Sequence, residues 1–150
     1  QVRFEGQAAM ELEFALEGVE IAEAYELPIV SGHASRITHH ASPSLNWSPM
    51  VKAILADLKH GLPISQISAR FHNALAEAIV AVARQVGQPR VVLSGGCFQN
   101  RYLTERSIQR LQEAGFRPYW HQRVPPNDGG ISLGQVVAAL RQTRPVHSEA

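Results

Sequence analysis

Cysteine is almost absent from the 150-residue sequence, and this scarcity excludes one class of protein at once. Cys97 has no second thiol in the chain, so an internal disulfide framework is excluded and a reducing, cytoplasmic setting is favoured. Aromatic residues make up 7% and charged residues 18% of the chain, against 45% hydrophobic residues, which is typical of a globular domain. No apolar run approaches the roughly 20 residues that span a bilayer, so we expect no membrane segment.

Familiar ligand-binding motifs are missing as well. The chain contains neither G-x-G-x-x-G nor G-x-x-x-x-G-K-[ST], which excludes the dinucleotide fingerprint and the P-loop. None of the seven histidines is paired with another at the i, i+4 spacing of a helical zinc motif. The chain by itself therefore lacks a metal-site pattern.

Charge is unevenly distributed although the net charge is only +1. Residues 1–26 carry seven Glu and one Arg, whereas residues 84–123 carry seven Arg and two Glu. A basic region attracts nucleic acid or phosphorylated ligands. No nucleic-acid-binding module accompanies it, so we interpret the region first as a solvated helix face that carries Arg side chains. Of the charged partners we expect a phosphate-bearing small ligand and no nucleic acid.

Hydrophobic periodicity predicts an α/β fold with a mostly parallel sheet flanked by helices. Helices are expected over 7–16, 48–61, 64–87 and 129–141, a further helix is expected after residue 96, and strands are expected over 90–93 and 116–120. Strands and helices that alternate at this interval indicate crossover connections. The helix that ends at Gly87 has an apolar stripe of Ile67, Phe71, Leu75, Ala78 and Val82.

Less regular segments lie earlier in the chain and at its end. Residues 27–30 and 36–40 are candidate strands of a hairpin around Ser31-Gly32. The helix that follows is expected to begin with Ser48 as its N-cap, because Pro49 then occupies the first helical position. Residues 143–150 are interpreted as a tail.

Two glycine turns follow the two expected strands. Ser94-Gly95-Gly96 lies between a strand and a helix, where backbone can approach a ligand, and spacing alone is equally consistent with a turn that binds nothing. In the second turn, residues 125–130, Asp128 is either a ligand for a hard cation or the N-cap of the last helix, and spacing alone favours the cap. Both turns should open at one edge of the sheet and form one cleft.

His72 and Cys97 have potentially reactive side chains, but we expect both to be structural residues. His72 lies beside the apolar stripe and is interpreted as a partly buried structural residue. Cys97 follows the glycine pair, but no His and carboxylate partners are set by sequence to activate it, so we expect a small packed residue rather than a nucleophile.

The two glycine motifs together resemble the C-terminal part of the hydrogenase-maturation carbamoyltransferases, the HypF family. The resemblance rests on LSGGCFQNR at residues 93–101 and PPNDGGISLGQ at residues 125–135. FEGQAAMELE at 4–13, LKHG at 58–61 and ARFHNALAE at 69–77 agree with it. The resemblance implies an actin-like, hexokinase-like (ASKHA) ATPase fold, of which residues 1–142 would be the second RNase H-like half, the C-terminal lobe of a Kae1-like domain.

The family's activity is implied in the same way. Such an enzyme makes carbamoyl adenylate from carbamoyl phosphate and ATP, and passes the carbamoyl group to the C-terminal cysteine of the partner HypE, for the cyanide ligand of nickel-iron hydrogenase. Carried onto this sequence, Gly95, Gly96 and Asn100 match the nucleotide-contacting turn and Gly6 is a weaker match on the adenosine side. Asp128 matches the family's metal-binding Asp, for Mg, Fe or Zn. The catalytic residues remain unknown.

The resemblance also shows what this chain lacks. The family's H-x-x-x-H helix and first phosphate loop belong to the other half of the domain and do not occur here. The sequence starts at Gln1, so we interpret it as a piece of a longer polypeptide that is inactive alone, because transition-state stabilisation needs groups from both sides of a cleft. The alternatives are an O-carbamoyltransferase, a tRNA threonylcarbamoyl-transfer protein of the same fold, and a noncatalytic interaction module.

Overall fold

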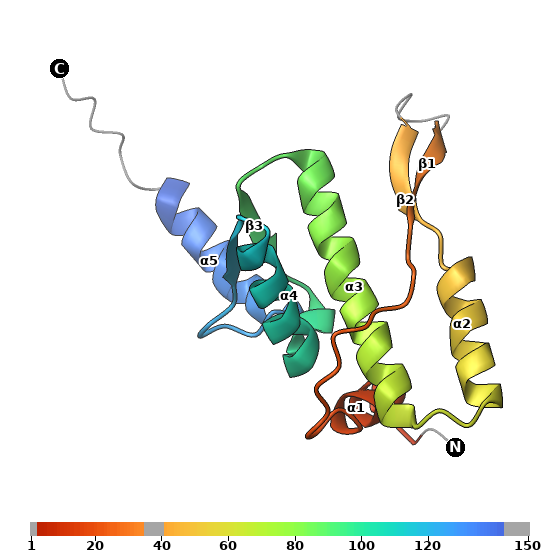
Figure 1. The fold of residues 1–150 in the computed structure, drawn as a ribbon. Helices are drawn as coiled ribbons and strands as arrows, with labels where there is room; N and C mark the ends of the chain where they lie inside the picture. The colour runs from red at the N-terminus through yellow and green to blue at the C-terminus, as the bar shows by residue number, and fades with distance from the viewer. Residues whose placement is uncertain (1–2, 35–40, 143–150) are drawn as a thin grey trace.

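The computed structural model describes residues 3–34 and 41–142 (Figure 1). Its elements, in chain order, are α1 (Gln7–Phe14), β1 (Ile29–Ala34), β2 (Ala41–Leu45), α2 (Ser48–Lys59), α3 (Ile64–Val86), β3 (Arg90–Leu93), the 3₁₀ helix η1 (Gly96–Gln99), α4 (Arg101–Glu113), β4 (Arg117–Trp120), the 3₁₀ helix η2 (Asp128–Gly130) and α5 (Ile131–Gln142). The predicted tail and the predicted strand over 36–40 lie outside the described residues.

A parallel strand pair with a helical crossover confirms the α/β class. β3 and β4 pair in parallel, with Arg90 opposite Arg117 and Leu93 opposite Trp120, and α4 connects them. The helices α3 and α4 pack on this pair through a buried cluster of Val80, Ala83, Leu93 and Leu111. Among the described strands the parallel pairing is limited to these two, since β1 and β2 form a separate antiparallel pair.

The long helix α3 forms the centre of the molecule, but its buried face differs from the predicted stripe. The helix ends as expected at Gly87, whose φ of 73° is a left-handed conformation that glycine adopts without strain. Ser68, His72 and Asn73 are buried on it, whereas Val82 is 37% exposed. The spacing of apolar residues does not reveal buried polar side chains, because hydrogen bonds compensate their burial.

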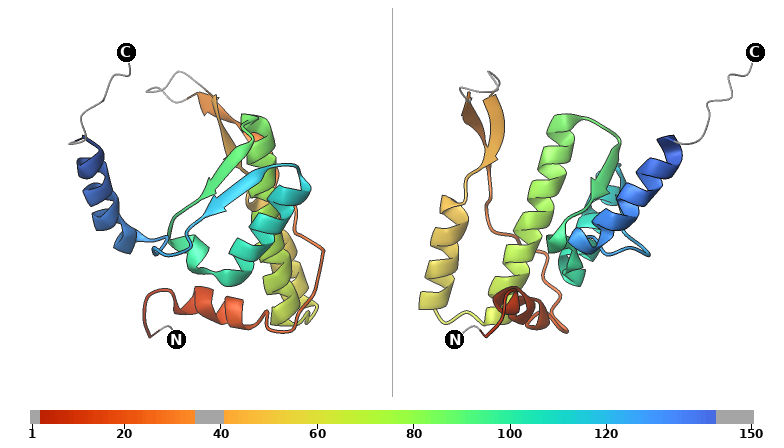
Figure 2. Two further views of the ribbon diagram at one scale, coloured as in Figure 1. Left: turned by 90° about the vertical axis from the view of Figure 1, so that its left-hand side faces the viewer. Right: turned by 180° about the vertical axis from the view of Figure 1, so that it is seen from behind.

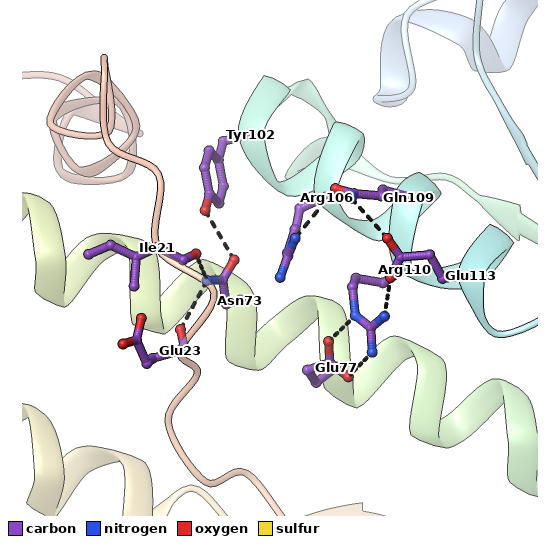
Figure 3. Close-up of polar contacts among 9 residues, drawn as sticks. All are labelled: Ile21, Glu23, Asn73, Glu77, Tyr102, Arg106, Gln109, Arg110 and Glu113. Carbon is purple, nitrogen blue, oxygen red and sulfur yellow. Dashed lines mark hydrogen bonds and ion pairs between the residues drawn. The ribbon is translucent and has the colours of Figure 1, made fainter.

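Asn73 shows how one such polar residue organises its surroundings (Figure 3). Its Nδ2 donates to the carbonyl oxygens of Ile21 at 2.7 Å and Glu23 at 2.9 Å, and its Oδ1 accepts from the Tyr102 hydroxyl at 3.0 Å. Residues 19–28 have no regular secondary structure, so their backbone groups need side-chain partners of this kind. Asn73 thus fastens this segment to both α3 and α4.

Two residues of the predicted stripe that are not buried line an open apolar groove. Leu75 and Val82 face a groove of about 630 Å³, to which β3 and the residues after it also contribute. In that groove Val92 is 71% exposed. The stripe was therefore correctly identified as apolar, but part of it borders the open groove rather than belonging to either core cluster.

A second core cluster joins α2 to the opposite face of α3. It contains Tyr25, Met50, Ile67 and Ala74. The Tyr25 hydroxyl donates to Asp57 Oδ2 at 2.7 Å, and Arg70 Nη1 donates to the same oxygen at 3.1 Å. Burial, together with the neighbouring Asp57 carboxylate, raises the pKa of Tyr25 to about 12.

Two predicted boundaries were wrong by a few residues. The hairpin strands are β1 and β2, so the first strand begins two residues after the predicted start at Leu27 and continues through Ser31 and Gly32, where the turn was predicted. Helix α2 includes Ser48 rather than being capped by it, with Trp47 at the N-cap position. Asn46 Oδ1 accepts from the Ser48 N–H at 3.1 Å, so the side chain that satisfies a backbone N–H at the start of this helix belongs to Asn46 rather than to Ser48.

The last helix, α5, is present as predicted, and it lies across the strand pair from α3 (Figures 1 and 2). Its apolar residues are exposed rather than packed, with Ile131 at 55% and Leu133 at 49%. Within the described ranges, no helix combines the length and the apolar character needed to cross a membrane.

Candidate functional site

The candidate site begins where β3 and β4 end. Because Leu93 and Trp120 are paired in parallel register, the next residues, Ser94 and His121, become neighbours at the carboxyl edge of the pair. Ser94 Oγ and His121 Nε2 lie 3.0 Å apart. The segments that follow β3 and β4 therefore begin at the same edge of the strand pair (Figure 2). Ligands bind at this edge in open α/β sheets.

A backbone hydrogen bond joins the two glycine turns at this edge. Gly95 N–H donates to the Pro126 carbonyl oxygen at 2.9 Å. Gly95 has φ 109° and ψ 159°, a backbone conformation that is essentially restricted to glycine. The expectation that both turns share one edge is confirmed, while a cleft that includes Gly95, Gly96 and Asp128 stays a prediction.

Asn100 closes the first turn and begins α4. Its Oδ1 accepts from the Leu103 N–H at 2.8 Å, so Asn100 is the side-chain N-cap of the helix. Its Nδ2 lies 3.0 Å from Nε2 of the buried His72. Asn100 was predicted to contact nucleotide, and the structure adds that its amide already holds the turn in place.

The second turn settles which residue caps its helical end. Asn127 Oδ1 accepts from the Gly129 N–H at 3.1 Å, so the N-cap of η2 is Asn127 and not Asp128. Among the residues that the structure describes, the exposed Asp128 carboxylate has no hydrogen-bond or ion-pair partner. The capping interpretation of Asp128 is therefore wrong, because its neighbour performs that task.

The described residues do not provide a complete metal site. In residues 3–34 and 41–142, no three His, Cys, Asp or Glu side chains gather closely enough to hold an ion. Asp128 supplies one free carboxylate in the first turn of η2, and a hard cation needs several oxygen ligands. The chain thus fits one ligand of a cation site rather than the whole site.

Gly6 directly precedes α1, and the opposite end of that helix contacts α4. The contact between α1 and α4 is made by Glu13, whose Oε1 accepts from the Arg101 N–H at 2.6 Å. Gly6 is the N-cap residue of α1, with φ 82°, and is about 10 Å from Glu13 at 1.5 Å per helical residue. The structure therefore joins α1 to the start of α4, and a nucleotide contact at Gly6 stays a prediction.

His72 is buried as the sequence predicts, whereas Cys97 is exposed. His72 is 4% exposed and fully hydrogen-bonded, which confirms a structural residue, and burial lowers its pKa below the usual 6.5. Cys97 was expected to be packed, but it is exposed and borders the apolar groove.

Sequence reasoning missed His121 as a residue of this edge. The available signal was positional, since Ser94 and His121 each directly follow an expected strand of similar length. In parallel strands, residues at equivalent positions after the last pair lie side by side. The register was needed to use that signal.

Comparisons with known proteins agree with this geometry. Residues 1–135 match the family model described as carbamoyltransferase, Kae1-like domain, second subdomain. The chain is 37% identical over 141 residues to carbamoyltransferase HypF of Synechocystis sp., covering 94% of this chain and 17% of that protein. It is 31% identical over 140 residues to HypF of Rhodobacter capsulatus, covering 91% of this chain and 16% of that protein.

Solved structures give the same result. A crystal structure of full-length HypF in the phosphate- and nucleotide-bound form superposes with a TM-score of 0.79 at 39% identity, over 97% of this chain and 19% of that one. HypF of T. kodakarensis superposes with a TM-score of 0.68 at 25% identity, over 93% and 17%.

The fold and the paired turns thus define a Kae1-like α/β lobe of the actin-like, hexokinase-like class. The chain belongs to the HypF carbamoyltransferase family and corresponds to the second subdomain of its Kae1-like domain. It spans less than a fifth of the length of the relatives reported above.

Proposed function

We propose that residues 1–142 form one wall of a carbamoyl-transfer centre in hydrogenase maturation. In this proposal the complete enzyme makes carbamoyl adenylate from carbamoyl phosphate and ATP. The carbamoyl group then passes to the C-terminal cysteine of HypE. The family membership and the nucleotide-bound state of a solved relative support this function. The cytoplasm is the proposed compartment because the proposed reaction consumes ATP, which that compartment supplies.

The observation that carries the proposal is the hydrogen bond from Gly95 to Pro126. It holds two glycine turns together at the carboxyl edge of parallel strands, and a Cβ atom added at Gly95 or Gly96 would meet open space. We assign Gly95 and Gly96 to nucleotide contact because a turn without Cβ atoms lets a phosphate or a sugar approach the backbone closely. Asn100 holds the turn, and Gly6 is assigned to the adenosine side on the resemblance alone.

Asp128 is proposed as this chain's ligand for a divalent cation that residues outside the described chain complete. Its carboxylate is exposed and unpaired, and the capping task that could have explained it belongs to Asn127. A bound cation there supplies Lewis-acid help to a phosphate or carbonyl oxygen. The chain's own contribution is to hold the carboxylate at the edge where Gly95 and Pro126 meet.

The test is Asp128→Asn in the full-length protein. We expect loss of thiocarboxamide formation on HypE and lower bound-metal content, with a nearly unchanged thermal midpoint, because Asp128 makes no stabilising contact. Asn127→Ala is the matched control, since losing the cap costs about 1 kcal/mol while the carboxylate stays. Full transfer activity with unchanged metal content in the Asp128→Asn protein would refute the assignment.

A further inference from the structure

A chain of hydrogen bonds runs beneath the candidate site from α1 through α3 to the start of α4. Ser68 Oγ donates to the Leu12 carbonyl oxygen at 2.6 Å, which ties α3 to α1. One turn further along α3, His72 Nδ1 lies 2.8 Å from the Ser68 carbonyl oxygen. His72 Nε2 lies 3.0 Å from Asn100 Nδ2, which leads to the glycine turn. His72 is therefore the central link.

The hydrogen-bond partners of His72 determine which of its ring nitrogens carries a proton. The Leu103 N–H can only donate, so the Asn100 atom that faces it is the oxygen, and the atom that faces His72 is the NH₂ group. His72 Nε2 must then accept a hydrogen bond. The Ser68 carbonyl oxygen can only accept, so Nδ1 carries the proton. His72 is consequently a neutral imidazole with its proton on Nδ1.

We propose that neutral His72 is the positioning residue of the nucleotide site, because it fixes the Asn100 amide and through it the Gly95–Asn100 turn. This inference rests on the proposed nucleotide site. Protonation of Nε2 would place two donors opposite each other. Turning the Asn100 amide to relieve that conflict would remove Oδ1 from the Leu103 N–H and so break the cap of α4.

The surroundings of His72 favour the neutral form. Glu13 of α1 is the charged group that acts on it, and it favours the charged imidazole. Tyr102 of α4 meets the ring edge-on, with centroids 5.8 Å apart, and Phe71 does so from α3 at 5.3 Å. Burial among these groups outweighs Glu13, so the pKa of His72 lies below the usual 6.5. Nucleotide binding should therefore be full above pH 6.5 and weaken as the pH falls below it.

The experiment measures the Kd for ATP with Mg²⁺ from pH 5.5 to 8.0 in the full-length protein. His72→Gln keeps an acceptor for Asn100 but does not titrate. The Kd for ATP of this variant at pH 8 should lie within about threefold of that of the unsubstituted protein, and the pH dependence caused by His72 should be absent. His72→Leu has no acceptor, so it should bind roughly tenfold more weakly at every pH. His60→Gln, on the exposed end of α2, is the control and should retain the normal profile.

A second readout does not require nucleotide. The ¹⁵N shifts of the His72 ring should report the neutral Nδ1–H form at pH 7 in the same protein. A charged ring or the Nε2–H form would overturn the proposal, as would a pH profile that His72→Gln leaves unchanged. No ATP binding by the unsubstituted protein at pH 8 would instead refute the proposed nucleotide site, and the positioning role with it.

Discussion

Removal of the Asn73 side chain should release residues 19–25 from the helices and lower the stability of the fold. Asn73 is 1% exposed and makes three hydrogen bonds, two to backbone carbonyl oxygens and one from Tyr102. A hydrogen bond of this kind contributes about 1 kcal/mol net, so Asn73→Ala should cost about 3 kcal/mol. That is a large part of the roughly 5–15 kcal/mol that stabilises a typical domain.

The matched control is Tyr102→Phe, which removes only the bond to Asn73 Oδ1 and should cost about 1 kcal/mol. Urea unfolding of both variants and the double variant forms a thermodynamic cycle, in which the Tyr102 effect should vanish once Asn73 is absent. Hydrogen exchange should also show faster exchange at the backbone amides of residues 19–25 in Asn73→Ala. A loss below about 1 kcal/mol, or additive effects in the cycle, would refute this reasoning.

Two further predictions concern the second turn and an ion pair on α3. Gly130→Ala should cost about 1–3 kcal/mol in urea unfolding, because its Cβ would lie 2.9 Å from the Pro125 carbonyl oxygen, whereas Gly134→Ala, with open space, should stabilise α5 by up to about 1 kcal/mol. Glu77→Gln should lower stability by about 1 kcal/mol or less at pH 7, since the Arg110 partner is partly solvent-screened. The hydrogen bonds from Arg110 lower the pKa of Glu77 below 4.5, so its contribution is present above pH 4.5 and lost as the pH falls below it. Unfolding curves at pH 7 and pH 3 that show the same Glu77→Gln deficit would contradict this.

The sequence predicted most of what depends on local chemistry. The strand over 90–93, the end of α3 at Gly87 and the strand predicted over 116–120, which the structure has at 117–120, followed from apolar runs and glycine stops. The resemblance to HypF, which the comparisons confirm, came from the two glycine motifs. Each of these features is encoded in a short continuous stretch of chain, so it can be predicted without a structure.

The features that the sequence did not predict depend on distant partners. Asn73 and Ser68 look like surface residues of a helix until Ile21 and Leu12 are placed beside them. The cap is Asn127 rather than the predicted Asp128, because helix boundaries drawn from sequence are accurate only to one or two residues. His121 joined the site only through the strand register.

Hydrogen bonds to the rest of the lobe fix one side of the candidate site, and the groups on its other side are exposed. Strand pairing, the Gly95 to Pro126 hydrogen bond and the His72 to Asn100 contact fix the first turn from three directions. The exposed Asp128 carboxylate has no partner among the described residues, and the apolar face of α5 is uncovered. A preorganised wall can orient a nucleotide, but stabilising the charge that develops during group transfer requires donors on the other side as well. The same geometry that supports nucleotide binding by this chain therefore also predicts that carbamoyl transfer needs groups it does not contain.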